Sequence, residues 1–124
     1  MINAIEELRS AQEWSANRPK KFLEAWKRGI KLIGEDYFLI NGHLDDATDK
    51  NQLKPNTELI ESALNILSKG QATFLAAMYS FYNDKDGQRY LEQLGRPNIT
   101  DISAYLDKEN LEVIADLFVN YCGW

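Results

Sequence analysis

Residues 72–82 read Ala72-Thr73-Phe74-Leu75-Ala76-Ala77-Met78-Tyr79-Ser80-Phe81-Tyr82, and this stretch decides the fold. On a helix its large side chains point in nearly every direction, whereas a surface helix keeps its apolar residues on one side. It is too short to cross a bilayer, which needs about 20 apolar residues. We therefore expect a central helix that is surrounded by the other helices of an all-α fold.

The size and composition of the chain are those of one globular domain. It has 124 residues, of which 44% are hydrophobic and 27% are charged, so wholesale disorder is excluded. A chain of this length can bury roughly two thirds of its unfolded surface around a single core. We predict one all-α domain over residues 1–124, a bundle of about six to seven helices that ends in a helical hairpin. No motif identifies a family.

Two helices are expected before residue 42. The first spans about residues 3–14 and is weakly amphipathic, and residues 15–19 break it because Pro19 suits the first turn of a new helix. The second helix then runs to about Asn41, with Gly42 in the left-handed conformation that commonly closes a helix. A β-hairpin at Asn41-Gly42 is the alternative. The apolar stripe of the second helix contains Phe22, Leu23, Trp26, Ile30, Ile33 and Tyr37.

Further helices are expected on both sides of residues 72–82. One opens at Pro55-Asn56-Thr57 and is closed by Lys69-Gly70, and a short one covers about residues 88–94. In residues 98–124, a capping box from Asn98 to Asp101 and a cap at Asp107 predict a helical hairpin. The stripe after Pro55 contains Leu59, Ile60, Ala63, Leu64 and Leu67. The last helix is expected to bury Leu111, Ile114, Leu117, Phe118 and Tyr121.

The net charge of −5 is unevenly distributed along the chain. Residues 1–34 carry seven basic and four acidic side chains, whereas residues 35–124 carry seven basic and fifteen acidic ones. A mostly acidic surface disfavours nucleic acid as the main partner, because basic side chains supply most of the non-specific affinity for phosphate. The basic residues of the helix at 18–31 lie off its apolar stripe, so they form either a solvated face or a docking face for an acidic partner or a phosphate backbone. They are Lys20, Lys21, Lys27, Arg28 and Lys31.

The only histidine lies close to three aspartates in a polar segment, residues 43–54. Imidazole and carboxylate groups bind zinc, iron and manganese, so His43, Asp45, Asp46 and Asp49 are weak candidates for a metal site or a general base. Their spacing matches no strong metal-binding template. The alternative is a solvated loop in which the aspartates cap a helical turn.

No cofactor is predicted from the motifs in the chain. Residues 83–87 resemble part of a calcium-binding EF-hand loop, but Tyr82 and Gln93 would then occupy the first and twelfth ligand positions. The chain also has no glycine-rich phosphate loop.

The single cysteine and the first residues favour a cytoplasmic location. Cys122 cannot form an intramolecular disulfide, and residues 1–7 lack the basic start and long apolar run of a signal peptide. We expect Cys122 to be a small apolar filler near the end of the last helix, with a reactive thiol as the alternative.

Trp124 ends a chain that has no polar tail. It is expected to cover one end of the core, and the alternative is an exposed aromatic anchor for a partner, a role in which Trp is enriched.

Three functions remain after these patterns are weighed. The first is a protein-interaction module of the adaptor, regulatory or inhibitor type, without catalytic activity, that binds another protein or its own copy and no membrane. The second is a ligand or metal binder, or an enzyme, that uses the cluster around His43 in a pocket. The third and weakest is nucleic-acid binding through the basic helix at residues 18–31. The candidate partner-binding residues are Lys20, Lys27, Arg28, Lys31 and Trp124.

Overall fold

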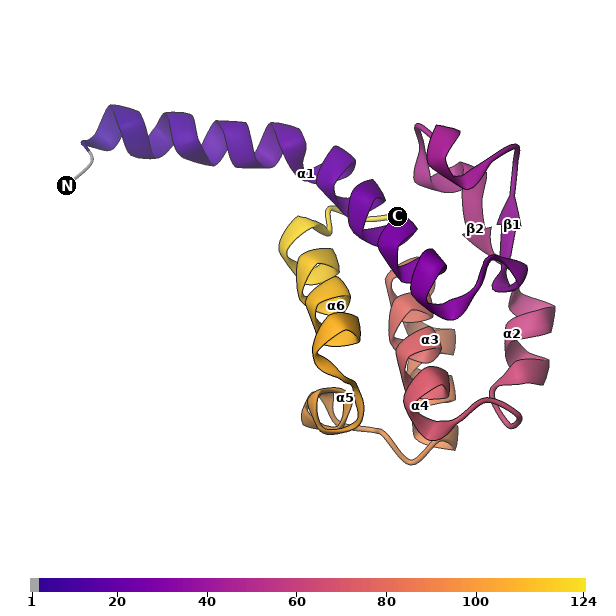
Figure 1. Ribbon diagram of the computed structural model, residues 1–124. Helices are drawn as coiled ribbons and strands as arrows, with labels where there is room; N and C mark the ends of the chain where they lie inside the picture. The colour runs from indigo at the N-terminus through magenta and orange to yellow at the C-terminus, as the bar shows by residue number, and fades with distance from the viewer. Residues whose placement is uncertain (1–2) are drawn as a thin grey trace.

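A computed structural model describes residues 3–124, which form six α-helices and one two-stranded antiparallel sheet (Figure 1). The prediction of an all-α fold with about six to seven helices is therefore confirmed. The helices are α1 (Ala4–Ile33), α2 (Thr57–Ala63), α3 (Lys69–Tyr82), α4 (Asp84–Gln93), α5 (Ile99–Tyr105) and α6 (Lys108–Asn120). The strands are β1 (Phe38–Ile40) and β2 (Leu53–Pro55).

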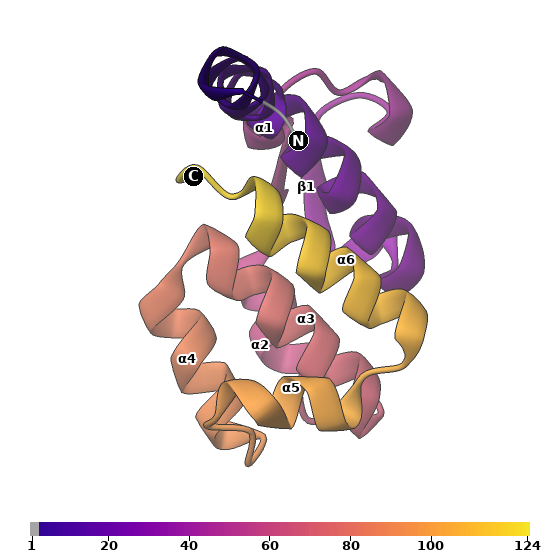
Figure 2. The same cartoon turned by 90° about the vertical axis from the view of Figure 1, so that its left-hand side faces the viewer.

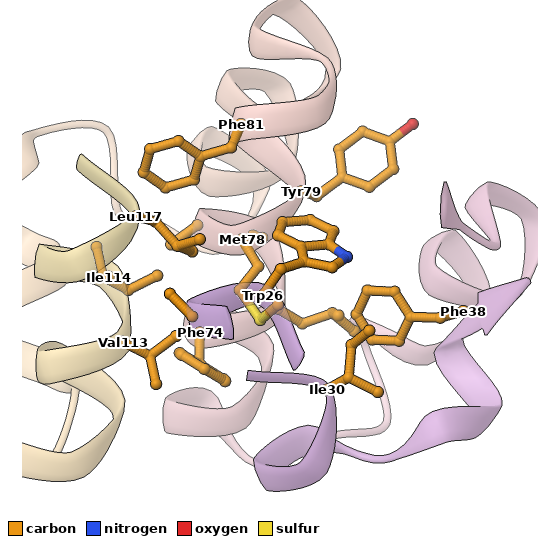
Figure 3. Packing of buried hydrophobic residues seen from close by; sticks show 14 of the residues in the cluster. Trp26, Ile30, Phe38, Phe74, Met78, Tyr79, Phe81, Val113, Ile114 and Leu117 are labelled. Carbon is orange, nitrogen blue, oxygen red and sulfur yellow. The ribbon is translucent and has the colours of Figure 1, made fainter. Parts of the chain in front are cut away.

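Helix α3 is the centre of the fold, as its apolar circumference predicts. Nine of its residues are buried, and it packs against α1, α4, α5 and α6. Phe74 and Met78 of α3 lie among Trp26 from α1 and Leu117 from α6 in the close view of the core (Figure 3). The large side chains on all sides of α3 are thus covered by different helices, which is the arrangement that such a helix requires.

Helix α1 runs without interruption from Ala4 to Ile33, so the prediction of two helices separated at residues 15–19 is wrong. Pro19 lies inside the helix, where it removes one backbone hydrogen bond and crowds the preceding turn. The axis of α1 changes direction in its middle (Figure 1), which is the usual effect of an internal proline. The helical turns on both sides are continuous, so Pro19 bends the helix and does not end it.

The prediction that this helix continues to Asn41 is also wrong. Helix α1 ends at Ile33 because Gly34 adopts a φ of +123°, and the chain then enters β1. Strand β1 pairs with β2, Ile40 lying opposite Leu53, and the indole N–H of Trp26 donates to the Leu53 carbonyl over 2.9 Å. Residues 41–52 connect β1 to β2. The strands therefore form a hairpin with a long connection, and not one with a two-residue turn at Asn41-Gly42.

Lys69 and Gly70 begin α3, so the prediction that they close the preceding helix is wrong. Helix α2 already ends at Ala63, and the Ser68 hydroxyl accepts a hydrogen bond of 3.3 Å from the backbone N–H of Gln71. Ser68 is thus the N-cap of α3, and a side chain that satisfies a free N–H fixes the start of a helix.

The predicted helical hairpin at the C-terminus is confirmed as α5 and α6. In the expected capping box, the backbone N–H of Asn98 donates a hydrogen bond of 3.0 Å to the Asp101 carboxylate. The Asp107 carboxylate accepts a hydrogen bond of 2.9 Å from the Asn110 N–H. Phe118 departs from the prediction because it is 53% exposed, and Leu111 and Tyr121 are only partly buried. The buried residues of α6 are Val113, Ile114, Leu117 and Asn120.

Candidate functional site: a projecting helix and an apolar groove

The first half of α1, residues 4–18, projects from the body of the protein (Figure 1). Its start is fixed by a capping box of two hydrogen bonds. The Asn3 side chain accepts one of 2.9 Å from the Glu6 N–H, and the Glu6 carboxylate accepts one of 3.3 Å from the Asn3 N–H. Of residues 4–18, only Arg18 is partly buried and all the others are exposed. We call residues 4–18 the projecting helix.

The projecting helix carries an apolar face that no other element within residues 3–124 covers. Ile5 is 69% exposed and Leu8 is 61% exposed. Ile5 and the buried Leu23 are eighteen residues apart, about five helical turns, so they belong to the same side of α1. Ile5 and Leu8 are therefore exposed apolar residues on the side of α1 that is buried in the anchored half.

The base of the projecting helix is tied to the end of α6. The Arg18 guanidinium donates to the Tyr121 carbonyl and lies 4.4 Å from the centre of the Trp14 ring. Trp14 is 48% exposed. These contacts hold the base of the projecting helix close to the C-terminal segment, and Ile5 and Leu8 extend beyond it.

An apolar groove of about 510 Å³ opens between α3, α4, α5 and α6. These helices face the viewer in Figure 2, and the projecting helix is seen nearly end-on above them. A pocket of this size and character is a typical binding site. The groove is lined by the apolar side chains of Phe81, Leu91, Ile99, Ile102, Ile114 and Phe118.

Arg96 is the only basic side chain that lines the described groove, and it is only 8% exposed. Its guanidinium lies 3.3 Å from the centre of the Tyr105 ring and donates a hydrogen bond of 3.2 Å to the Gly95 carbonyl. Its Nε has no hydrogen-bond partner, and within residues 3–124 it forms no ion pair. A buried cation without a carboxylate is costly, so the groove contains a charge that an anionic group would stabilise. Asp84 also lines the groove.

The basic side chains predicted as a docking face mostly contact the protein itself. Lys27 donates to the carbonyls of Asp45 (3.1 Å) and Ala47 (2.6 Å), and Arg28 forms an ion pair with Asp116. Lys20 is exposed. Their part in partner binding stays a prediction, but the contacts of Lys27 and Arg28 give them a structural use.

Lys31 pairs with Asp45 over 2.7 Å. The hydrogen bond and charge of Lys31 lower the pKa of the Asp45 carboxyl below its ordinary value. Because both side chains are well exposed, this pair stabilises the fold only slightly.

The candidates around His43 do not assemble into one site. His43 is exposed and lines none of the three pockets described for residues 3–124. Within this part of the chain, no three His, Cys, Asp or Glu side chains are grouped to hold a metal ion. Asp49 instead caps the short helical turn at residues 50–52, where its carboxylate accepts a hydrogen bond of 2.7 Å from the Asn51 N–H, as the loop alternative predicts.

Trp124 lies against the core, and the centre of its ring is 4.9 Å from the centre of the Trp26 ring. Its indole N–H donates a hydrogen bond of 3.0 Å to the side-chain oxygen of Asn51. This is the core-covering position that the sequence analysis expects, and the role as a partner-binding residue stays a prediction. Cys122, in contrast, is exposed, so the expectation of a buried filler is wrong.

Two parts of the candidate site are not found by sequence reasoning. Phe118 fits the apolar period of α6, so its sequence position predicts burial, and nothing in the period indicates a groove. Arg96 lies between Gly95 and Pro97 in a turn, where an arginine is expected to be solvated. Of the candidate site, only Ile5 and Leu8 could be recognised from the sequence, because their helical spacing is visible in it.

Comparisons with family models, with curated proteins and with solved structures found no match to this chain. None of the helices within residues 3–124 combines the length and the apolar character that a membrane span needs. The surfaces themselves must therefore supply the argument for function.

Proposed function

We propose that this protein is an interaction module of the adaptor, regulatory or inhibitor type, without catalytic activity, which binds a protein partner through the projecting helix. A partner that covers one side of this helix would bind in the helix-in-groove mode, in which apolar side chains at helical spacing enter an apolar groove. We place this activity in the cytoplasm, because a chain with one cysteine makes no internal disulfide.

The observation that supports the proposal is the uncovered apolar face of the projecting helix. Burial of a large aliphatic side chain stabilises a complex by about 1.5–3 kcal/mol, and Ile5 and Leu8 are both available for it. A free helix of about 15 residues is marginally stable in water. A partner would therefore stabilise the projecting helix and remove its apolar face from water at the same time.

Native mass spectrometry tests this function on tagged protein that is isolated gently, at low salt, from its own host. We expect the wild-type chain to carry a bound protein, either another protein or a second copy. The variant Leu8→Lys should lose it, because a charge then replaces an apolar contact. The variant Ser10→Lys is the matched control, because Ser10 lies on the opposite side of the helix from Ile5 and Leu8.

A wild-type sample that shows only the mass of one tagged chain, 14.3 kDa plus the tag, would contradict the proposed function. Equal loss of the bound protein in Leu8→Lys and Ser10→Lys would contradict the role of the apolar face.

A further inference from the structure

We infer that the partner is a second copy of this chain, and that the projecting helix of each copy docks in the apolar groove of the other. This inference rests on the proposed function, because it names the partner of the same helix. It also assigns a ligand to the groove, an acidic and apolar helical segment.

The projecting helix cannot bind the groove of its own chain. It is one continuous helix with the anchored half of α1, which is fixed in the core through Trp26 and Ile30, both fully buried. Figure 1 shows that its free end points away from α5 and α6. A groove that accepts this helix must therefore belong to another molecule.

The projecting helix and the helices whose residues line the groove lie on the same side of the molecule. Figure 2 views that side, with the projecting helix extending toward the viewer above α4, α5 and α6. Two copies that face each other across a twofold axis can therefore exchange their helices in one arrangement. Contacts of this reciprocal kind are typical of symmetric dimers, which are the commonest oligomers.

The two surfaces match in apolar character. Ile5 and Leu8 are one turn apart, so their side chains lie on the same side of the helix and can contact the same partner. The groove offers Phe118 at 53% exposure and Ile99 at 68% exposure, and both are uncovered in one chain by itself.

Their charges are also complementary. Residues 4–13 carry Glu6, Glu7 and Glu13 against the single basic Arg9, so the free end of the helix is acidic. In the groove, Arg96 has no carboxylate partner within the described residues. A glutamate of the docked helix would supply one, and Arg9 would lie in a groove that also contains Asp84.

The first test measures self-association by sedimentation across a range of concentrations. We expect the wild-type chain to form a species of twice 14.3 kDa. The helix variant, Ile5→Lys with Leu8→Lys, and the groove variant, Phe118→Lys, should each weaken the dimer at least tenfold. Val119→Lys is the matched control for the groove variant, because Val119 is equally exposed and next in sequence but does not line the groove. Circular dichroism confirms that each variant is folded.

The second test mixes the two defective variants. The helix variant retains an intact groove and the groove variant retains an intact helix, so their mixture restores one of the two contacts. We expect unlabelled groove variant to shift the amide NMR signals of α5 and α6 in ¹⁵N-labelled helix variant. Unlabelled helix variant should shift none of these signals.

The possible outcomes separate this inference from the proposed function. A monomeric wild-type protein that still holds a different protein through Leu8 would overturn the second copy as partner and leave the interaction module standing. A dimer that resists Phe118→Lys, or a mixture without shifts at millimolar concentration, would overturn docking in the groove. A bare monomer from the host would overturn both.

Discussion

The two halves of α1 contain a tryptophan each, and the two rings have opposite environments. Trp26 is fully buried in the anchored half, where its indole N–H donates to Leu53 and its ring packs on Phe38. Trp14 is 48% exposed in the projecting half, where it contacts the Arg18 guanidinium. One helix thus contains a segment that builds the core and a segment that contributes almost nothing to it.

The difference shows that periodicity does not determine burial. Ile5 and Leu23 share a side of the helix, yet Ile5 is 69% exposed and Leu23 only 9%. Helices α3 and α6 pack against the anchored half, whereas among the described residues no element extends far enough to cover the projecting half. The stability of the fold should therefore depend on the anchored half alone, and the function on the projecting half.

The largest expected effect comes from the two tryptophans. Trp26→Ala should lower the free energy of unfolding by about 3–5 kcal/mol, because it leaves a cavity in the core. Trp14→Ala should change it by less than about 0.5 kcal/mol, as is usual for a surface position. Urea denaturation of dilute, monomeric protein measures both. Comparable losses in the two variants would show that the projecting half is packed in solution.

A smaller effect is expected at Gly29, where α1 packs against side chains of α3 and α6. A Cβ placed at Gly29 would lie 2.6 Å from the terminal atoms of Met78 and 3.2 Å from Val113. Gly29→Val should therefore lower the free energy of unfolding by about 2 kcal/mol through overpacking. Ala16→Val in the projecting half should cost about 0.5 kcal/mol, through helix propensity alone. Thermal unfolding of the pair compares them, and an unchanged Gly29→Val would show that Met78 moves aside freely.

The ion pair between α1 and α6 should matter still less. Arg28→Ala removes the contact with Asp116 and should cost about 0.2–1 kcal/mol, because both side chains are about half exposed. Arg9→Ala in the projecting half should have no measurable effect on the monomer. Urea denaturation at low and high salt checks both, and a loss in Arg28→Ala that persists in high salt would contradict a screened surface pair.

The smallest effect is a change in titration with very little change in stability. The Lys31 side chain lowers the pKa of Asp45, so Lys31→Met should raise that pKa toward its ordinary value near 3.8. A lowered pKa favours the folded state above the ordinary value, and this small contribution disappears as the pH falls through the lowered one. NMR titration of the Asp45 carboxyl measures the shift. Lys20→Met is the control and should leave the titration of Asp45 unchanged.

The features that could be predicted from the sequence depend on local chemistry. The apolar circumference of residues 72–82 predicts a surrounded helix, and α3 is that helix. The Asp101 carboxylate accepts a hydrogen bond from the Asn98 N–H, and the Asp107 carboxylate accepts one from the Asn110 N–H. Both bonds join residues three apart, so these side chains identify the starts of α5 and α6 from the sequence. The stripe that begins at Phe22 likewise predicts which side of α1 is buried.

The wrong predictions occur where a distant segment or a competing contact decides. The sequence predicts a break at residues 15–19 with Pro19 in the first turn of a new helix, but a helix tolerates one lost hydrogen bond when it bends. Residues 38–40 were expected to be helical, but they pair with β2, which begins thirteen residues after β1 ends. The candidate groove could not be predicted at all, because it is assembled from four helices.

The sequence by itself determined the central helix, the caps of α5 and α6 and the buried side of the anchored half of α1, since side-chain period and capping act within a few residues. Only the tertiary structure decided that the same apolar side continues uncovered from Ile5 to Leu8 and that Phe118 lines an open groove. The physical reason is that burial depends on which elements lie opposite a side chain. That arrangement is set by contacts between residues far apart in the chain.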